Sequence, residues 1–161
     1  MNIFTVSFFG HRELDNFTAT ERRLEQIVHD LLMNKEYVEF LVGRNGDFDQ
    51  LAASTVRRMK RTCGDCNSSL VLVLPYPTAE YRNNEDSFHE YYDDVEICNA
   101  SAGAHFKSAM QIRNREMVDR SDLVLCCIEH QSGGAWQTVQ YAIKQEKTII
   151  NLVEDGKDSE L

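Results

Sequence analysis

Apolar residues follow two periods along this chain, one typical of buried strands and the other of amphipathic helices. The run Ile3–Phe9 is continuously apolar or small and rich in strand formers, which predicts a central parallel strand covered on both faces. The segment Thr18–Asn34 then places leucine, isoleucine and valine at helical spacing, which predicts a helix. Further strands are expected at Tyr37–Val42, Ser69–Leu74, Leu123–Ile128 and Thr148–Val153, and further helices at Asp49–Thr62, Phe106–Arg120 and Ala135–Glu146.

This alternation of strands and helices predicts the fold class. Strands separated by helices pair in parallel through right-handed crossovers. We therefore expect an α/β fold, a Rossmann-like three-layer sandwich with a mainly parallel sheet of about five strands. Residues 1–154 are expected to form a single domain and residues 155–161 a frayed tail. The polar, tyrosine-rich segment Tyr76–Ala104 is predicted to be a long loop with at most one short helix.

Charge disfavours a surface that wraps nucleic acid. The chain has 26 acidic and 17 basic residues, a net charge of −9, whereas phosphate contacts need clustered lysine and arginine. A local basic pocket remains compatible with this balance. Seven of the carboxylates lie in one segment opposed only by Arg82, and we interpret it as a solvated face. They are Glu80, Glu85, Asp86, Glu90, Asp93, Asp94 and Glu96.

The cysteines and the apolar runs suggest a cytoplasmic protein. No apolar stretch is long enough to span a membrane, and Ile3–Phe9 lacks the basic flank of a secretory signal. The five cysteines show no disulfide-rich pattern, which favours a reducing compartment. Cys63 and Cys66 have the spacing of half a zinc site, but no compact second half exists, so we predict neither a metal site nor a cofactor.

Glycines mark one edge of the predicted sheet. Five of the eight glycines follow predicted strands: Gly10 the first, Gly43 and Gly46 the second, and Gly133 and Gly134 the fourth. The carboxyl ends of parallel strands are where such sheets bind ligands, and glycine lets the backbone present its N–H groups there. We therefore expect a ligand site at this edge, although glycines also end elements and make turns in most proteins.

The loops that carry these glycines also carry polar groups suited to a nucleotide. His11 and Arg12 follow Gly10, and Arg12 could reach a phosphate. Arg44 lies in the second loop, where Asp49 is either a helix N-cap or a carboxylate that accepts hydrogen bonds from ribose hydroxyls. Ser132 and the glycines after it open a helix whose N-terminal N–H groups suit an anion.

Three further polar residues lie inside predicted helices. Thr138 lies one turn into the helix that follows Ser132, and it either donates its hydroxyl or packs. Arg113 and Asn114 lie in the middle of another helix. Two arginines in such a helix usually form a solvated face, but asparagine is a poor helix former, which favours a specific hydrogen bond at Asn114.

Several of these segments resemble the YpsA-like branch of the SLOG superfamily, which includes the LOG-type nucleotide phosphoribohydrolases and the DNA-processing protein DprA. They are SFFGHRE, VGRNGDFDQLAA, LVLPY, IRNREMVDRSDLVLCCI and SGGAWQTVQYAIKQEKTIINL. The resemblance covers Val6–Leu152, and it is weak over Tyr81–Phe106. It implies a Rossmann-like sheet and a pocket for nucleotides or their derivatives. Matched by motif, it points to Gly10, Arg12, Gly43, Asp49, Arg113, Asn114, Gly133, Gly134 and Thr138.

The chain departs from the hydrolase pattern at the position that would support catalysis. LOG-type hydrolases carry PGG-x-G-T-x2-E, whose glutamate assists cleavage of an N-glycosidic bond. Here Ser132 replaces the proline, the spacing to Thr138 is one residue longer, and Tyr141 stands at the glutamate position. General acid–base catalysis of that kind then lacks its carboxylate, unless Asp49 or Asp119 replaces it.

Three functions follow, of which we favour the first: binding or sensing of a nucleotide-derived, phosphate-bearing small molecule. The second is hydrolysis of a nucleotide N-glycosidic bond. The third is a DprA-like nucleic-acid-binding scaffold, in which homo-oligomers would gather Arg12, Arg44 and Arg113 into a stripe. The candidate ligand-binding residues are Gly10, His11, Arg12, Gly43, Arg44, Gly46, Asp49, Arg113, Asn114, Ser132, Gly133, Gly134 and Thr138.

Overall fold

The strands of the chain form one sheet. The computed structural model describes residues 1–64, 66–153 and 159–160. The strand order is β4-β3-β2-β1-β5-β6-β7. Strands β1 to β6 pair in parallel, and β7 pairs antiparallel with β6. The bounds are β1 Ile3–Gly10, β2 Tyr37–Val42, β3 Ser68–Leu74, β4 Asp94–Ile97, β5 Leu123–Cys127, β6 Thr148–Asn151 and β7 Ser159–Glu160.

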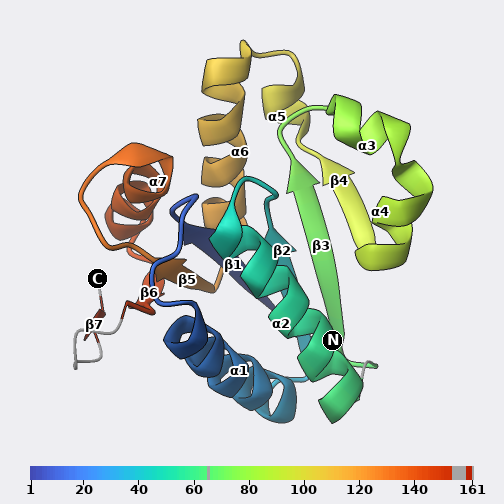
Figure 1. Cartoon of the computed structure of the whole chain (residues 1–161), viewed down its shortest axis with the longest axis vertical. Coiled ribbons are helices and arrows are strands. Elements are labelled where there is room, and N and C mark those ends of the chain that lie inside the picture. Colours follow the sequence, from blue (N-terminus) through green and yellow to red (C-terminus); the bar gives the residue numbers. More distant parts are fainter. Residues whose placement is uncertain (65, 154–158, 161) are drawn as a thin grey trace.

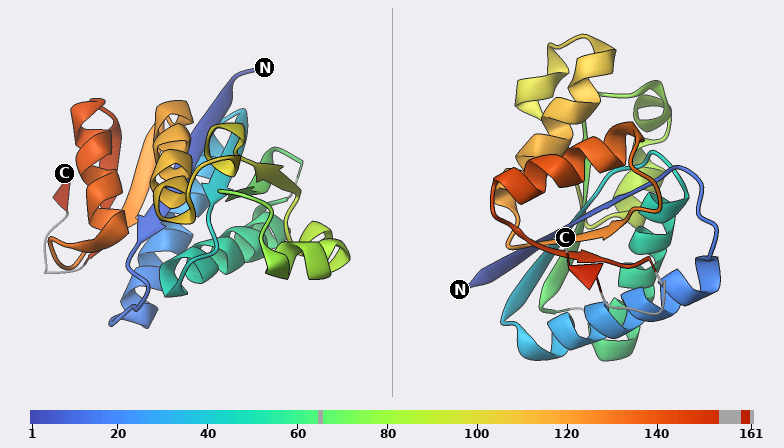
Figure 2. Two further views of the ribbon diagram at one scale, coloured as in Figure 1. Left: turned by 90° about the horizontal axis from the view of Figure 1, so that it is seen from above. Right: turned by 90° about the vertical axis from the view of Figure 1, so that its left-hand side faces the viewer.

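Helices cover both faces of this sheet (Figure 1). Helices α1 and α2 lie on one face and α6 and α7 on the other, as the view from above shows (Figure 2). The predicted α/β, Rossmann-like three-layer sandwich is therefore confirmed. The bounds are α1 Phe17–Asn34, α2 Asp47–Cys63, α3 Ala79–Asn83, α4 Glu85–Tyr91, α5 Asn99–Ala102, α6 Phe106–Arg120 and α7 Gly133–Lys144.

Burial on both faces explains why the strands are almost continuously apolar. Successive residues of a strand point to opposite faces. Phe8 therefore packs into the core cluster beneath α1 and α2, whereas Phe9 packs into the cluster beneath α6 and α7. In β3, Leu72 and Val73 divide between the two clusters in the same way. A strand with both faces covered has no place for the polar half of an alternating pattern.

The prediction for Tyr76–Ala104 was wrong. This segment contains α3, α4, α5 and the strand β4, so the parallel part of the sheet has six strands instead of about five. Among the described strands, β4 pairs with β3 at the edge of the sheet. Its sequence Asp94-Val95-Glu96-Ile97 is half charged, and none of its side chains is fully buried. Helix α4 places Phe88 in the core beside Tyr92. Short elements at a sheet edge carry too little apolar periodicity to be recognised.

The C-terminal segment of the chain was expected to be a frayed tail. Most of the expected frayed tail, residues 155–158 and 161, lies outside the described residues, and Ser159–Glu160 form β7. The single domain over residues 1–154 stays a prediction. Within the described residues, no helix is both long enough and apolar enough to cross a membrane.

The strand order reverses next to β1. From β1 the chain moves outward through β2, β3 and β4, and it then returns to β5 on the other side of β1. Such a switch point separates the loops that leave the carboxyl ends of β1 and β5, and it is where open α/β sheets bind ligands.

Candidate ligand-binding site

A cavity of about 480 Å³ lies at this switch point, at the carboxyl ends of β1, β2 and β5. Most of the predicted residues line it. The backbone contributes the glycines Gly10, Gly43, Gly133 and Gly134. The side chains are His11, Arg12, Asp49, Arg113 and Asn114. A volume of this size lies within the range of small-molecule sites.

Arg44 does not line this cavity, although its loop does. Its Nε donates to Oε1 of Glu80 at 2.8 Å, and its Nη1 donates to the hydroxyl of Tyr92 at 2.9 Å. The guanidinium also lies 4.8 Å from the ring centroid of Phe88. Arg44 therefore ties the β2–α2 loop to α3 and α4, and it lines a separate groove there.

Gly46 also lies outside the cavity lining, but it positions a residue that lines it. A Cβ at Gly46 would lie 2.5 Å from Cα of Arg12. The neighbouring Asp47 N–H donates to the carbonyl of Arg12 at 2.8 Å. The absence of a side chain at Gly46 thus lets the loops after β1 and β2 pack directly on each other.

Two further predicted residues, Ser132 and Thr138, do not line the cavity. The Ser132 hydroxyl lies 2.8 Å from Nδ1 of His130 and does not cap the helix. Thr138 is buried, and its hydroxyl donates to the carbonyl of Gly134 at 2.9 Å and accepts from Nδ2 of Asn114 at 3.0 Å. The specific hydrogen bond expected of Asn114 therefore exists, and it joins α6 to the second turn of α7.

The N-terminus of α7 opens onto the cavity. The helix begins at Gly133, whose φ of +90° lies in the region that favours glycine. No side chain caps this end, and Gly133, Gly134 and Ala135 line the cavity. The first N–H groups of a helix have no intrahelical acceptor, and they carry the positive end of the helix dipole. This end of α7 is therefore suited to an anion.

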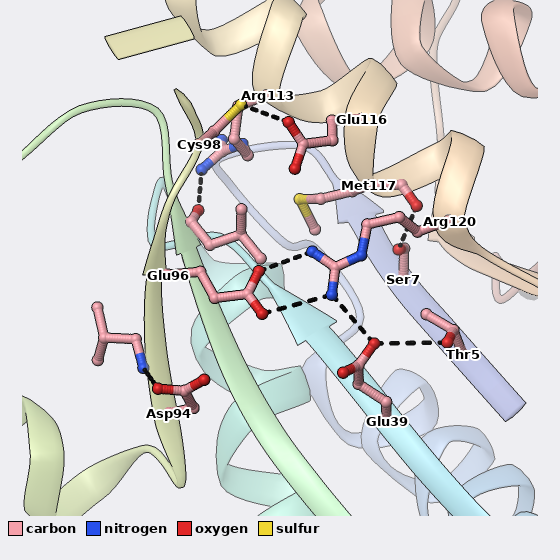
Figure 3. Close-up of polar contacts among 12 residues, drawn as sticks. Thr5, Ser7, Glu39, Asp94, Glu96, Cys98, Arg113, Glu116, Met117 and Arg120 are labelled. Carbon is pink, nitrogen blue, oxygen red and sulfur yellow. Dashed lines mark hydrogen bonds and ion pairs between the residues drawn. The ribbon is translucent and has the colours of Figure 1, made fainter. Parts of the chain in front are cut away.

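Helix α6 is bonded to the sheet at its C-terminal end. Arg120 donates from Nη1 to Glu96 of β4 at 2.7 Å and from Nη2 to Glu39 of β2 at 3.1 Å (Figure 3). The Ser7 hydroxyl of β1 donates to the carbonyl of Met117 at 3.2 Å. These bonds fix the base of α6 on the sheet, while its N-terminal half extends past the carboxyl ends of the strands (Figure 1).

Arg113 lies in the middle of α6 and is only 2% exposed. Its Nη1 donates to the carbonyl of Val73 at 2.6 Å (Figure 3). Its Nε donates to Oδ1 of Asn114 at 2.9 Å. Burial lowers the pKa of Arg113, and the charges of Asp49 and Cys98 oppose this shift. Among the described ion pairs, none joins Arg113 to a carboxylate within 4 Å. Its positive charge is thus buried without a direct ion pair, and Asp49 is the carboxylate whose charge stabilises it.

Asp49 faces Arg113 across a glycine. A Cβ at Gly43 would lie 3.1 Å from Oδ2 of Asp49 and 3.3 Å from both Nη atoms of Arg113. The N-cap of α2 is Gly46, so the N-cap interpretation of Asp49 was wrong. Asp49 lies in the first turn, and its Oδ2 accepts from the N–H of Asn45 at 2.9 Å. Burial raises the pKa of Asp49, while that hydrogen bond and the charge of Arg113 lower it.

His11 forms a stacked pair with a residue that the sequence did not single out. The rings of His11 and His130 lie 3.7 Å apart and nearly parallel. The backbone N–H of His130 donates to Nε2 of His11 at 3.4 Å. Burial and the neighbouring His130 lower the pKa of His11, opposed by that hydrogen bond. The neutral imidazole of His11 is therefore favoured at this wall of the cavity.

Other lining residues were also missed. Met110 and Gln111 stand three positions before Arg113 and Asn114, so helical spacing alone would have placed them on the same face. Gln111 donates from Nε2 to the carbonyl of Gly134 at 3.2 Å. Glu13 and Asn45 lie in loops already predicted to carry the site.

Tyr141, at the position of the hydrolase glutamate, does not line the cavity. Its hydroxyl donates to Oδ1 of Asp119 at 2.7 Å, and Arg115 lies over its ring. Asp119 does not line the cavity either. Of Asp49 and Asp119, the two carboxylates that could replace the glutamate, only Asp49 lines the cavity.

The cysteines belong mainly to the core. Burial raises the pKa of Cys126 to about 12 and contributes most to raising that of Cys127 to about 11, so both thiols stay protonated near neutral pH. Cys63 is half-buried at the end of α2, and Cys66 is exposed. Within the part of the chain that the structure describes, no three His, Cys, Asp or Glu side chains gather in a way that could hold a metal ion.

The fold is shared with known proteins, although no family model and no curated protein matches the sequence. DprA from Streptococcus pneumoniae superposes with a TM-score of 0.66 at 12% identity, over 91% of this chain and 49% of that one. DprA from Helicobacter pylori, described with a single-stranded DNA binding mode, gives 0.64 at 17% identity, over 97% and 68%. The molybdenum cofactor carrier protein of Chlamydomonas reinhardtii gives 0.57 at 14% identity, over 92% and 75%.

These identities establish similarity of fold alone. The chain spans about half the length of the Streptococcus pneumoniae protein. The resemblance seen in the sequence motifs and the superpositions agree on the architecture. This chain therefore shares its fold with DprA and with the molybdenum cofactor carrier protein.

Proposed function

We propose that this protein binds a nucleotide-derived, phosphate-bearing small molecule in the cavity at the strand carboxyl ends. One observation carries the proposal: the uncapped N-terminus of α7 and the buried guanidinium of Arg113 face the same cavity. A helix N-terminus binds phosphate through backbone N–H groups, and a buried cation is stabilised by an anion. Arg12, which also lines the cavity, adds a second positive side chain.

Asp49 supports a nucleotide over a simple phosphate. Its carboxylate lines the cavity and is a hydrogen-bond acceptor, which suits the hydroxyl groups of a ribose. The resemblance to the YpsA-like branch points to the same ligand class. A cavity that carries both anion-binding groups and a carboxylate favours a ligand with a phosphate and a polyol part.

The placement of the arginines argues against a nucleic-acid scaffold. Arg113 is buried and Arg44 is paired with Glu80, so these side chains do not form an exposed stripe. The chain also carries a net charge of −9. Phosphate backbones are bound by accessible clusters of lysine and arginine. We therefore favour a small molecule over DNA.

Hydrolysis of the bound nucleotide is the second candidate, because of Asp49. A carboxyl whose pKa burial raises is suited to general acid–base chemistry, and this one lines the cavity. Tyr141 and Asp119 lie elsewhere, so Asp49 would have to act without the glutamate of the LOG-type pattern. Binding needs no such substitution and remains the first proposal.

A thermal-shift screen tests the proposal. We expect at least one ligand among nucleoside monophosphates, nucleoside diphosphates, ADP-ribose and cyclic nucleotides to raise Tm by about 5–10 °C at a hundredfold excess over Kd. The matching nucleoside without phosphate should raise it far less. Chromatography of the incubated ligand separates the two candidates, since intact ligand supports binding and released base supports hydrolysis. Equal shifts with the nucleoside, or no shift with any phosphate-bearing ligand, would contradict the proposal.

A further inference from the structure

Two N–H donors from different elements converge on the sulfur of Met110. Nδ2 of Asn45, in the β2–α2 loop, lies 3.9 Å from this sulfur. Nη2 of Arg113, in α6, also lies 3.9 Å from it. A thioether sulfur is a weak acceptor. The best-buried cation of the cavity therefore pairs one of its terminal nitrogens with a poor partner.

The other contacts of Arg113 do not neutralise it. Its Nη1 and Nε donate to a backbone carbonyl and to an amide oxygen, both of which are uncharged. Asp49, whose charge raises the pKa of Arg113, lies on the other side of Gly43, and among the described ion pairs none within 4 Å joins the two side chains. Buried charges in proteins are usually paired, because an unpaired charge retains the full cost of leaving water. An anionic oxygen at the position of the sulfur would satisfy both donors.

We infer that Arg113 and Asn45 form a second anion subsite, which Met110 covers in this structure and which an anionic oxygen of the ligand enters by displacing the thioether. The inference rests on the proposed function. The uncapped N-terminus of α7 provides the first anion subsite in the same cavity. Two anion subsites in one cavity select a ligand with two linked phosphates, so the ligand class is a nucleoside diphosphate or its derivative.

Met110 is placed to move. Methionine has three rotatable side-chain bonds and adapts to irregular spaces. Met110 is only half-buried, and it lies in the N-terminal half of α6, which extends beyond the sheet (Figure 1). Phe106, one turn earlier, is 60% exposed. The displaced side chain can therefore turn toward solvent without disturbing either core cluster.

Calorimetric titration of ADP and AMP into three variants tests the inference. In the wild type, the apparent ADP affinity is the intrinsic affinity multiplied by the fraction of molecules in which Met110 leaves the subsite uncovered. Met110→Ala removes the cover and should tighten ADP binding about threefold to tenfold. Asn45→Ala removes one donor and should weaken ADP binding about tenfold.

Neither Met110→Ala nor Asn45→Ala should alter AMP affinity by more than about twofold, because AMP fills only the subsite at α7. Phe106→Ala, on the same end of α6 but outside the cavity, should change neither ligand.

The outcomes separate this inference from the proposed function. Nucleotide binding that Met110→Ala leaves unchanged or weakens would overturn the second subsite while the proposed function stands. An equal gain for AMP and ADP would overturn the assignment of two phosphates. Failure of both nucleotides to bind the wild type and Met110→Ala would overturn the inference, whereas the proposed function would be overturned only if the other phosphate-bearing ligands of the thermal-shift screen also failed to bind.

Discussion

Replacing Arg113 with methionine should weaken ADP binding by about 10- to 100-fold, because a hydrogen bond to a charged group contributes about 1.5–3 kcal/mol. The guanidinium is the cavity's buried cation, and no residue that lines the cavity can replace its charge at that depth. Calorimetric titration measures the effect. Arg115→Met is the matched control, since Arg115 lies two residues later on the exposed side of α6, over Tyr141. Unchanged ADP affinity in Arg113→Met would contradict this role.

The same variant should stay folded. Methionine is an unbranched side chain of similar volume. It also carries no charge, so the variant avoids the free-energy cost of burying a charge, which is what lowers the pKa of Arg113. That gain offsets the hydrogen bonds lost at Val73 and Asn114. We expect the free energy of unfolding to stay within about 1 kcal/mol of the wild type, as when buried ionic groups are replaced by apolar ones of similar volume. A large loss of binding without a comparable loss of stability is the result expected of a residue that acts on the ligand.

Substituting Gly10 with alanine should lower the free energy of unfolding by about 3 kcal/mol, at the upper end of the range for overpacked cores. The added Cβ would lie 2.4 Å from Cγ, 2.5 Å from Cδ2 and 2.6 Å from Cβ of Phe48. Phe48 is fully buried and packs against Phe8, so its ring has no free space to move into. The clash would displace the first turn of α2, which also carries Asp49, and ligand binding should weaken with stability.

Urea denaturation measures this loss of stability, and Gly103→Ala is the control because Gly103 has room for a side chain. A Cβ at Gly103 would meet nothing within 4 Å, and its φ of −94° suits any residue. Gly103→Ala should therefore change the free energy of unfolding by no more than about 0.5 kcal/mol. Equal stability of Gly10→Ala and Gly103→Ala would show that the contact between β1 and Phe48 is not as tight as described.

The sequence specifies the central strands well because they are buried on both faces. Ile3–Phe9 and Ser69–Leu74 are long apolar runs, and each forms a strand within one or two residues of its predicted bounds. Strand β4 was missed because an edge strand of four residues buries too little to leave a pattern. The three-layer arrangement follows from the alternation of elements, whereas the number of strands depends on such short segments.

The location of the cavity also follows from the sequence, but the orientation of individual side chains does not. Gly10, Gly43 and Gly133 mark the edge of the sheet because parallel strands end together. Arg44 lies in the expected loop, but its side chain points toward Glu80 and Tyr92. These partners belong to the segment of α3 and α4, whose helices the sequence pattern did not predict. Met110 was overlooked because an apolar residue carries no signal of chemistry until its donors are seen.

The most direct test of phosphate binding at the strand carboxyl ends is amide chemical-shift mapping by NMR during an ADP titration. We expect the largest changes at the N–H groups of Gly133, Gly134, Gly43 and Gly10, with little change at Ser68 and Lys147 near the amino ends of the strands. Changes confined to the groove between α2 and α4, or none at saturating ADP, would contradict it.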